Sequence, residues 1–165
     1  SLGLVGSEMC IRDRDSTNQT AANTTTAYAI TFDTTDFSNG ITLSNSSRIN
    51  VSQDGLYNIQ FSIQFKNTTN DTQDVEVWFK KNGTNIDKSN SKYGMPARKS
   101  AGDPSHLIGA LNFFVNLTTN DYIELMWRVS DVGVSIEASS ATTSPTRPAI
   151  PSVILTASFV SNLSA

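Results

Sequence analysis

The sequence predicts an all-β domain built as a two-sheet sandwich of about ten strands. Residues 54–66 alternate between apolar and polar side chains, which is the period-two pattern of a strand with one buried face. Similar short segments recur along the chain and are separated by turn signals rich in Gly, Asn, Asp and Ser. No segment shows the period of an amphipathic helix. Together these observations favour a sandwich or barrel.

The bulk composition narrows the possible functions. A chain of 165 residues is long enough for one domain with a substantial core. Its net charge is −3 and only 16% of its residues are charged, so the chain as a whole has no electrostatic basis for binding nucleic acid. No apolar run approaches 18 residues, and we therefore expect no membrane span. Cys10 is the single cysteine and cannot form an internal disulfide.

The first fourteen residues differ in composition from the rest of the chain. The string SLGLVGSEMCIRDR resembles a stray end that recurs on translated environmental sequence fragments, so we interpret residues 1–14 as a non-native scar. On this interpretation Cys10 has no function and the true N-terminal part is missing. Residues 15–25 lack periodicity and predict a flexible lead-in. The domain proper is expected over residues 26–165.

In chain order, a first strand is expected where apolar alternation begins at residues 27–32. Residues 33–40 are rich in Asp, Thr, Ser and Asn and predict a loop. Asn82-Gly83 is a strong hairpin signal. Residues 88–105 predict a long polar loop with one short strand near residues 92–95. The other strands are expected at residues 41–43, 49–51, 54–66, 74–81, 107–117, 122–129, 134–138 and 152–160, with a Pro/Ser/Thr loop at residues 139–151.

Residues 107–117 are apolar on both faces of the expected strand, which predicts that both faces are covered. Phe114 and Ile108 lie opposite the core-facing set. Leaving them in water would expose an apolar surface of the kind that marks interfaces. The alternative is that a loop or the N-terminal segment covers them within a monomer.

Several motifs in this order resemble the C1q/tumour-necrosis-factor-like jelly roll. They are Gly55-Leu56-Tyr57 at the head of an alternating strand, the Asn82-Gly83 hairpin, the run LTTNDY at residues 117–122 and a final apolar strand. The resemblance covers residues 26 to 160. The segments YNIQFSIQF, VWFKKNG and PSVILTASF make the chain most similar to the copies found in structural proteins of marine bacteriophages.

The resemblance implies a ten-strand jelly roll that assembles as a homotrimer and acts by binding, without catalysis and without a cofactor. Carried over by position, the residues that would face the trimer axis are Asn58, Gln60, Ala110, Asn112, Phe114, Ile154 and Thr156. Asn58 and Gln60 depart from the cytokine pattern, which has large apolar residues on this strand. Either the axis is hydrogen-bonded and partly wet, or the trimer is weaker or enforced by a missing stalk.

No catalytic or metal-binding motif stands out. His106 is the sole histidine, has no neighbouring Ser or Cys motif, and is interpreted as a loop residue bonded to backbone. Asn70, Asp71 and Asp74 form one group of oxygen ligands, and residues 33–39 hold another. Neither group has the spacing of an EF-hand. Because Asx residues form turns in their own right, we expect no metal site.

A basic segment offers a possible ligand loop. Its residues are Lys88, Lys92, Tyr93, Arg98 and Lys99. The cations could meet an anionic glycan of a host surface and Tyr93 could stack on a sugar ring, whereas the alternative is an ordinary solvated loop. Trp78 lies on the polar face of its strand, either as an interface anchor or packed under a neighbouring loop.

These observations lead to a ranked set of functions. The first is a bacteriophage virion protein that binds a host-surface glycan, a host protein or other virion proteins, and so resides on the extracellular virion. The second is a secreted or cell-surface C1q-like adhesion or signalling module of a cellular organism. The third is an enzyme such as a glycan hydrolase on a β-sandwich.

Overall fold

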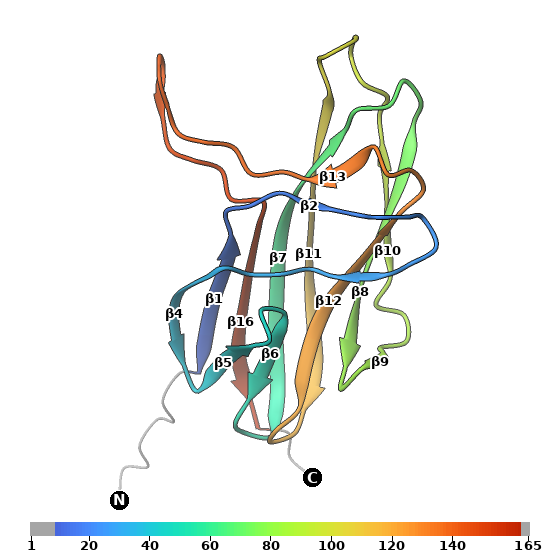
Figure 1. Cartoon of the computed structure of the whole chain (residues 1–165). Coiled ribbons are helices and arrows are strands. Elements are labelled where there is room, and N and C mark those ends of the chain that lie inside the picture. Colours follow the sequence, from blue (N-terminus) through green and yellow to red (C-terminus); the bar gives the residue numbers. More distant parts are fainter. Residues whose placement is uncertain (1–8, 163–165) are drawn as a thin grey trace, which may run out of the picture.

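Two antiparallel sheets pack face to face in the computed structural model, which describes residues 9–162 (Figure 1). The first sheet contains β1 (Cys10–Asp15), β2 (Gln19–Thr20), β4 (Thr34–Asn39), β7 (Gly55–Asn67), β11 (Ser105–Leu117), β13 (Val134–Ile136) and β16 (Val153–Ser161). The second contains β3 (Tyr28–Ala29), β5 (Ile41–Ser44), β6 (Arg48–Val51), β8 (Gln73–Lys81), β9 (Thr84–Asn85), β10 (Ser91–Met95) and β12 (Tyr122–Val129).

The longer strands follow a jelly-roll-like order. In the first sheet this order is β4-β1-β16-β7-β11, and in the second it is β5-β6-β12-β8-β10. These are the ten strands of four residues or more within the described range. The predicted all-β sandwich is therefore confirmed. Residues 9–162 contain no helix, and thus none that could span a membrane.

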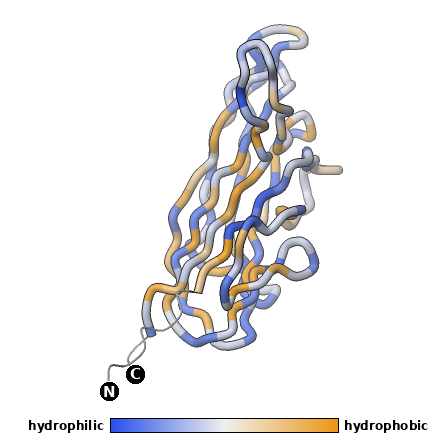
Figure 2. The backbone as a smooth tube through the Cα atoms, turned by 90° about the vertical axis from the view of Figure 1, so that its left-hand side faces the viewer, coloured by the Kyte–Doolittle hydropathy of each residue, from blue (hydrophilic) through white to orange (hydrophobic). Residues whose placement is uncertain are grey.

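The alternation of β7 positions the core. Tyr57, Ile59, Phe61, Ile63 and Phe65 are each at most 5% exposed, as the sequence predicts. Phe61 meets Phe79 of the second sheet edge-on at 5.9 Å between ring centroids, and Phe79 stacks on Phe113 of β11 at 5.0 Å. These rings join the two sheets. Figure 2 shows hydrophobic and hydrophilic stretches alternating along the long strands.

The N-terminal segment is part of the sandwich from Met9 onward. β1 lies between β16 and β4, and Ile11 is 1% exposed. Leaving residues 1–14 outside the fold was therefore wrong for Met9 to Arg14, since their alternation buries every second side chain. Residues 1–8 lie outside the described range. That the segment is non-native stays a prediction.

The flexible lead-in predicted over residues 15–25 is also wrong. Gln19 of β2 donates to the Thr31 carbonyl at 3.0 Å and accepts from the Thr31 amide at 2.9 Å. Asn23 accepts hydrogen bonds from the Thr25 and Thr26 amides, and Ala21 is buried. Side-chain amides therefore order a segment that has no apolar periodicity.

The loop predicted over residues 33–40 contains strand β4, which is an edge strand and carries mostly exposed residues. In the expected loop at residues 139–151, β14 (Thr142–Thr143) pairs with β15 (Thr146–Arg147) in a small hairpin. This hairpin projects from the sandwich, as the orange-red loop at the top left of Figure 1 shows. The strands predicted from residue 41 onward are present, with shifted ends.

Candidate functional site

The seven residues predicted to face a trimer axis share one surface, the outer face of β11, β7 and β16. Register places Asn112 opposite Gln60 and Gln60 opposite Thr156. The neighbouring rows are Phe114, Asn58 and Ser158 on one side, and Ala110, Ser62 and Ile154 on the other. We call this surface, together with Ile108 and Gln64 of the next row, the outer face of the first sheet.

This outer face exposes large apolar side chains. Ile108 is 61% exposed and Phe114 is 53% exposed, both on β11. Phe37 of β4, opposite Arg12 of β1, is 51% exposed and lines a hollow together with Ile154. The sequence predicted that both faces of β11 are covered, but within one chain its outer face is open. Phe114 and Ile108 are exposed apolar side chains of the kind that mark interfaces, whereas Phe37 is separated from β11 by β1, β16 and β7.

Polar side chains occupy the centre of the outer face, with Gln60 between Asn112 and Thr156 in register. Asn58 donates from Nδ2 to Oδ1 of Asn112 at 2.8 Å, across the β7–β11 pair. A hollow of about 370 Å³ lies between Gln60 and Ala110. A second hollow of about 390 Å³ lies on the opposite side of Gln60, beside Ile154 and Phe37. The face therefore offers both protruding apolar groups and shallow recesses.

The edge of β11 is a further part of this surface. Among the described residues, β11 pairs with β7 alone along all thirteen of its positions. On the open side, Lys81 Nζ bonds the Asn116 carbonyl at 3.3 Å and the Tyr93 hydroxyl bonds the Ala110 carbonyl at 3.3 Å. A long edge strand with exposed apolar residues is prone to associate with another chain.

His106 is not the backbone-bonded loop residue that the sequence suggested. It lies in β11, and its Nε2 is 2.9 Å from Oε2 of Glu137, whose Oε1 receives Lys66 Nζ at 2.6 Å. Burial alone would raise the pKa of Glu137, but the hydrogen bonds from Lys66 and His106 outweigh burial and hold it below its usual value. This ion-paired group joins β7, β11 and the end of β13.

The five residues of the predicted ligand loop do not converge. Lys88 precedes β10 and is 90% exposed, whereas Arg98 and Lys99 follow it. Lys92 pairs with Asp74 at 2.7 Å, Lys99 contacts Asp103 at 3.5 Å, and the Arg98 amide bonds the Thr69 carbonyl. Tyr93 packs on Phe65 at 5.8 Å between ring centroids, so its ring points inward and is not free to stack on a sugar.

The two Asx-rich segments serve as turns and ion pairs. Asp36 pairs with Arg12 and Arg14, and Asp33 accepts the Ser16 amide. Asp74 pairs with Lys92. Within residues 9–162, no group of three or more His, Cys, Asp or Glu side chains is arranged to hold a metal ion.

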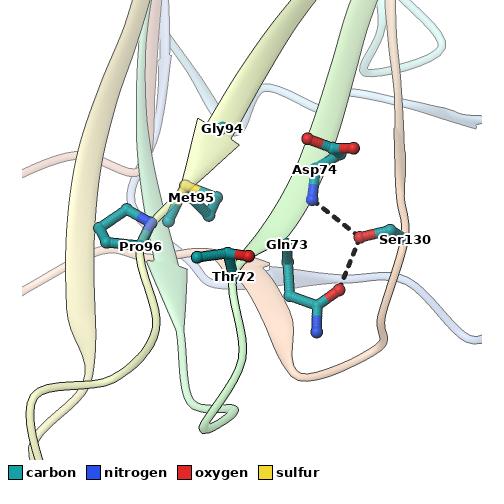
Figure 3. A pocket seen from close by; sticks show the side chains of 7 residues that line it. All are labelled: Thr72, Gln73, Asp74, Gly94, Met95, Pro96 and Ser130. Carbon is teal, nitrogen blue, oxygen red and sulfur yellow. Dashed lines mark hydrogen bonds between the residues drawn. The ribbon is translucent and has the colours of Figure 1, made fainter.

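A hollow at one end of the second sheet was not predicted from the sequence. It measures about 640 Å³ and is lined by Thr72, Gln73, Asp74, Gly94, Met95, Pro96 and Ser130 (Figure 3). We call it the Gly94 hollow. Gly94 lies directly opposite Asp74 in the β8–β10 pair. An isolated glycine within a strand is the one sequence signal that could have indicated it.

Charged side chains beside this hollow pair with one another on the outer face of the second sheet. Arg128 donates to Glu76 at 2.7 Å, and Asn90 donates to the same carboxylate at 3.0 Å. The hydrogen bond from Arg128, with that from Asn90, lowers the pKa of Glu76. Trp78 follows two residues along β8, is half-buried, and donates from Nε1 to Asn85 of β9 at 2.8 Å.

No known protein-family model matches the chain, and a search of curated proteins found no significant match.

Proposed function

We propose that this chain is a non-enzymatic structural and binding domain of a bacteriophage virion. On this proposal it is a C1q/TNF-like jelly-roll head, forms a homotrimer through the outer face of the first sheet, and mediates attachment or virion assembly at a fibre, neck or capsid surface. Its partners are a host-surface glycan or protein, or other virion proteins. Its place of action is extracellular, on the particle.

The observation that carries this proposal is the exposure of Phe114 and Ile108 on a long edge strand. Fully burying a side chain of this size contributes about 1.5–3 kcal/mol. Three equivalent copies of the face would supply this contribution three times around a closed axis. Closed symmetry is the common form of homo-oligomers, which favours a defined trimer over open association.

The polar centre of the face is compatible with burial at an axis. The Asn58 amide group and the Asn112 carbonyl oxygen bond each other within the chain. A neighbouring copy could therefore cover them without leaving that donor and acceptor unpaired, which is the main cost of burying polar groups. The hollows beside Gln60 offer recesses for apolar side chains of a neighbouring copy.

The experiment that tests the biological role is localisation on particles. Antibodies raised against the purified chain are applied with gold label to the particle fraction and to the cell fraction of a lysate from a culture that carries the gene. We expect label at a fibre, neck or capsid surface of virions. Label confined to cell surfaces would overturn the virion assignment and favour a cellular adhesion module.

A further inference from the structure

The Gly94 hollow exists because a cross-strand position carries no side chain. Gly94 faces Asp74 in register, and a Cβ built on Gly94 would meet no atom within 4 Å. Its φ does not lie in the left-handed region, so the backbone itself does not require glycine here. The glycine therefore leaves room beside Asp74 for a group from outside the chain.

Polar groups around the hollow are held in place by the fold. Ser130 accepts the Asp74 amide at 2.8 Å and donates from its hydroxyl to Gln73 Oε1 at 2.7 Å. Figure 3 shows the Asp74 carboxylate directed away from this pair. Lys92 bonds one oxygen of that carboxylate, which retains further acceptor sites. Fixed hydroxyl, amide and carboxylate groups are suited to recognise hydroxyl groups of a ligand.

An apolar wall completes the hollow. Pro96 lines the side opposite Ser130 in Figure 3 and is exposed, whereas Met95, the preceding residue, is fully buried. A mixed lining of a few oriented polar groups and an apolar surface is typical of small-molecule sites. Pyranose rings have this same mixed character, with hydroxyl edges and a C–H face.

The charged side chains beside the hollow have no net charge. Asp74 pairs with Lys92 and Glu76 pairs with Arg128, so two carboxylates meet two cations. A strongly charged ligand would have to compete with these internal pairs, whereas a neutral ligand can bond to them. Trp78 lies four residues from Asp74 on the same face of β8, roughly 13 Å along the strand.

We propose that the Gly94 hollow is a subsite for one sugar ring of a neutral oligosaccharide, whose chain continues along β8 toward Trp78. Asp74 and Ser130 bond ring hydroxyls, and Pro96 contacts the C–H face of the ring. This inference rests on the proposed binding function and names its ligand class. It places the ligand on the second sheet, away from the face proposed for trimerisation.

Calorimetric titration of the intact chain tests the subsite. The neutral probes are maltotriose, cellotriose and triacetylchitotriose, and the anionic probe is trigalacturonic acid. We expect at least one neutral probe to bind in the millimolar range or tighter, with heat that the anionic probe does not give. Binding of none of the neutral probes, or of the anionic probe alone, would overturn the proposal.

Substitutions in the hollow test whether the sugar binds there. Gly94→Phe fills the hollow from a position that accepts a side chain, and Asp74→Asn removes the charged acceptor while keeping its shape. We expect each to weaken binding of the neutral probe by about tenfold or more. Thr42→Phe, which adds the same ring at an exposed position of β5, is the matched control and should bind as the unaltered chain does.

The oligomeric mass of each variant is measured in the same samples. Gly94→Phe should keep the mass of the unaltered chain, because the hollow lies outside the outer face of the first sheet. If Gly94→Phe binds sugar as tightly as the unaltered chain does, the location is wrong. A monomeric mass for the unaltered chain with sugar binding intact would contradict the trimer proposal and leave the subsite standing.

Discussion

Phe114 lies directly opposite Asn58 across the β7–β11 pair, with its ring 53% exposed on the outer face of the first sheet. The apolar ring thus borders the amide that bonds Asn112. An exposed ring beside a side-chain donor that is already bonded within the chain is the arrangement on which the proposed interface rests.

Replacing Phe114 by Glu is expected to dissociate the proposed trimer. The change removes apolar burial and places a charge at the interface, which together weaken association by roughly a hundredfold or more. The β-rich circular dichroism spectrum should persist because the ring contributes little to the core. Val132→Glu is the control, since Val132 is 52% exposed in a loop outside this face. An unchanged mass for Phe114→Glu would remove Phe114 from the interface.

Replacing the buried aspartates of β1 is expected to change the free energy of unfolding in opposite directions, upward for Asp13 and downward for Asp15. Oδ2 of Asp13 has no hydrogen-bond partner among residues 9–162, whereas Asp15 bonds Thr17 and Thr31 through its two oxygens. The other oxygen of Asp13, Oδ1, accepts a hydrogen bond from the Thr35 hydroxyl, so replacing both Asp13 and Thr35 by Val removes the unpaired group without leaving Thr35 unpaired. We expect this double variant to raise the free energy of unfolding by about 1–3 kcal/mol, and Asp15→Val to lower it by a similar amount.

The increase in the free energy of unfolding that follows replacement of Asp13 and Thr35 should depend on pH. Burial raises the pKa of Asp13, so the folded state holds this proton more tightly than the unfolded state does. Above the raised pKa, Asp13 is charged in both states and the folded state bears the full cost of burying that charge. Below the ordinary pKa of 3.8, Asp13 is protonated in both states and this cost disappears. Urea unfolding at pH 7 and near pH 3 measures this difference. An equal gain at both values of pH would contradict the assigned cause.

Asp121 is expected to stabilise the fold at neutral pH and to lose this effect in acid. Burial alone would raise its pKa, but hydrogen bonds from Lys81, Thr118 and Asn82 outweigh burial and hold the pKa far below 3.8. Stabilisation is therefore present above about pH 4 and declines as pH falls further toward the lowered pKa. Asp121→Asn should lower the free energy of unfolding at pH 7 by about 1–3 kcal/mol and flatten this pH dependence.

The control for Asp121 is Asp87→Asn. Asp87 is 90% exposed beside Lys88, and its replacement should change stability by no more than about 0.5 kcal/mol. If the two variants unfold at the same urea concentration, the hydrogen bonds to Asp121 do not stabilise the fold as argued.

Alternation in the sequence predicted the strands whose inner faces form the core. β7, β8 and β12 place an apolar residue at every second position because each packs against the opposite sheet. β4 was missed because an edge strand needs no such face, and its one large apolar residue, Phe37, is exposed. β1 was missed because residues 1–14 were interpreted as a non-native scar, and because two of its three buried positions are Asp13 and Asp15, so the strand shows no apolar alternation.

The two candidate sites differ in how much of each could be predicted from the sequence. The family resemblance predicted seven axis-facing residues on β7, β11 and β16, and the register places them in neighbouring rows of one face. That this face surrounds a trimer axis stays a prediction. The Gly94 hollow depends on the register between β8 and β10 and on Ser130 at the end of β12. No short-range pattern specifies these long-range pairings, because each register is decided by the packing of whole sheets.

The central claim is that this chain is a homotrimer, and the molar mass of the intact chain in solution tests it most directly. Light scattering coupled to size exclusion, at micromolar concentration and neutral pH, should give three times the mass of a single chain. The mass of one chain alone would contradict the account and leave the exposed face of β11 without the partner proposed for it.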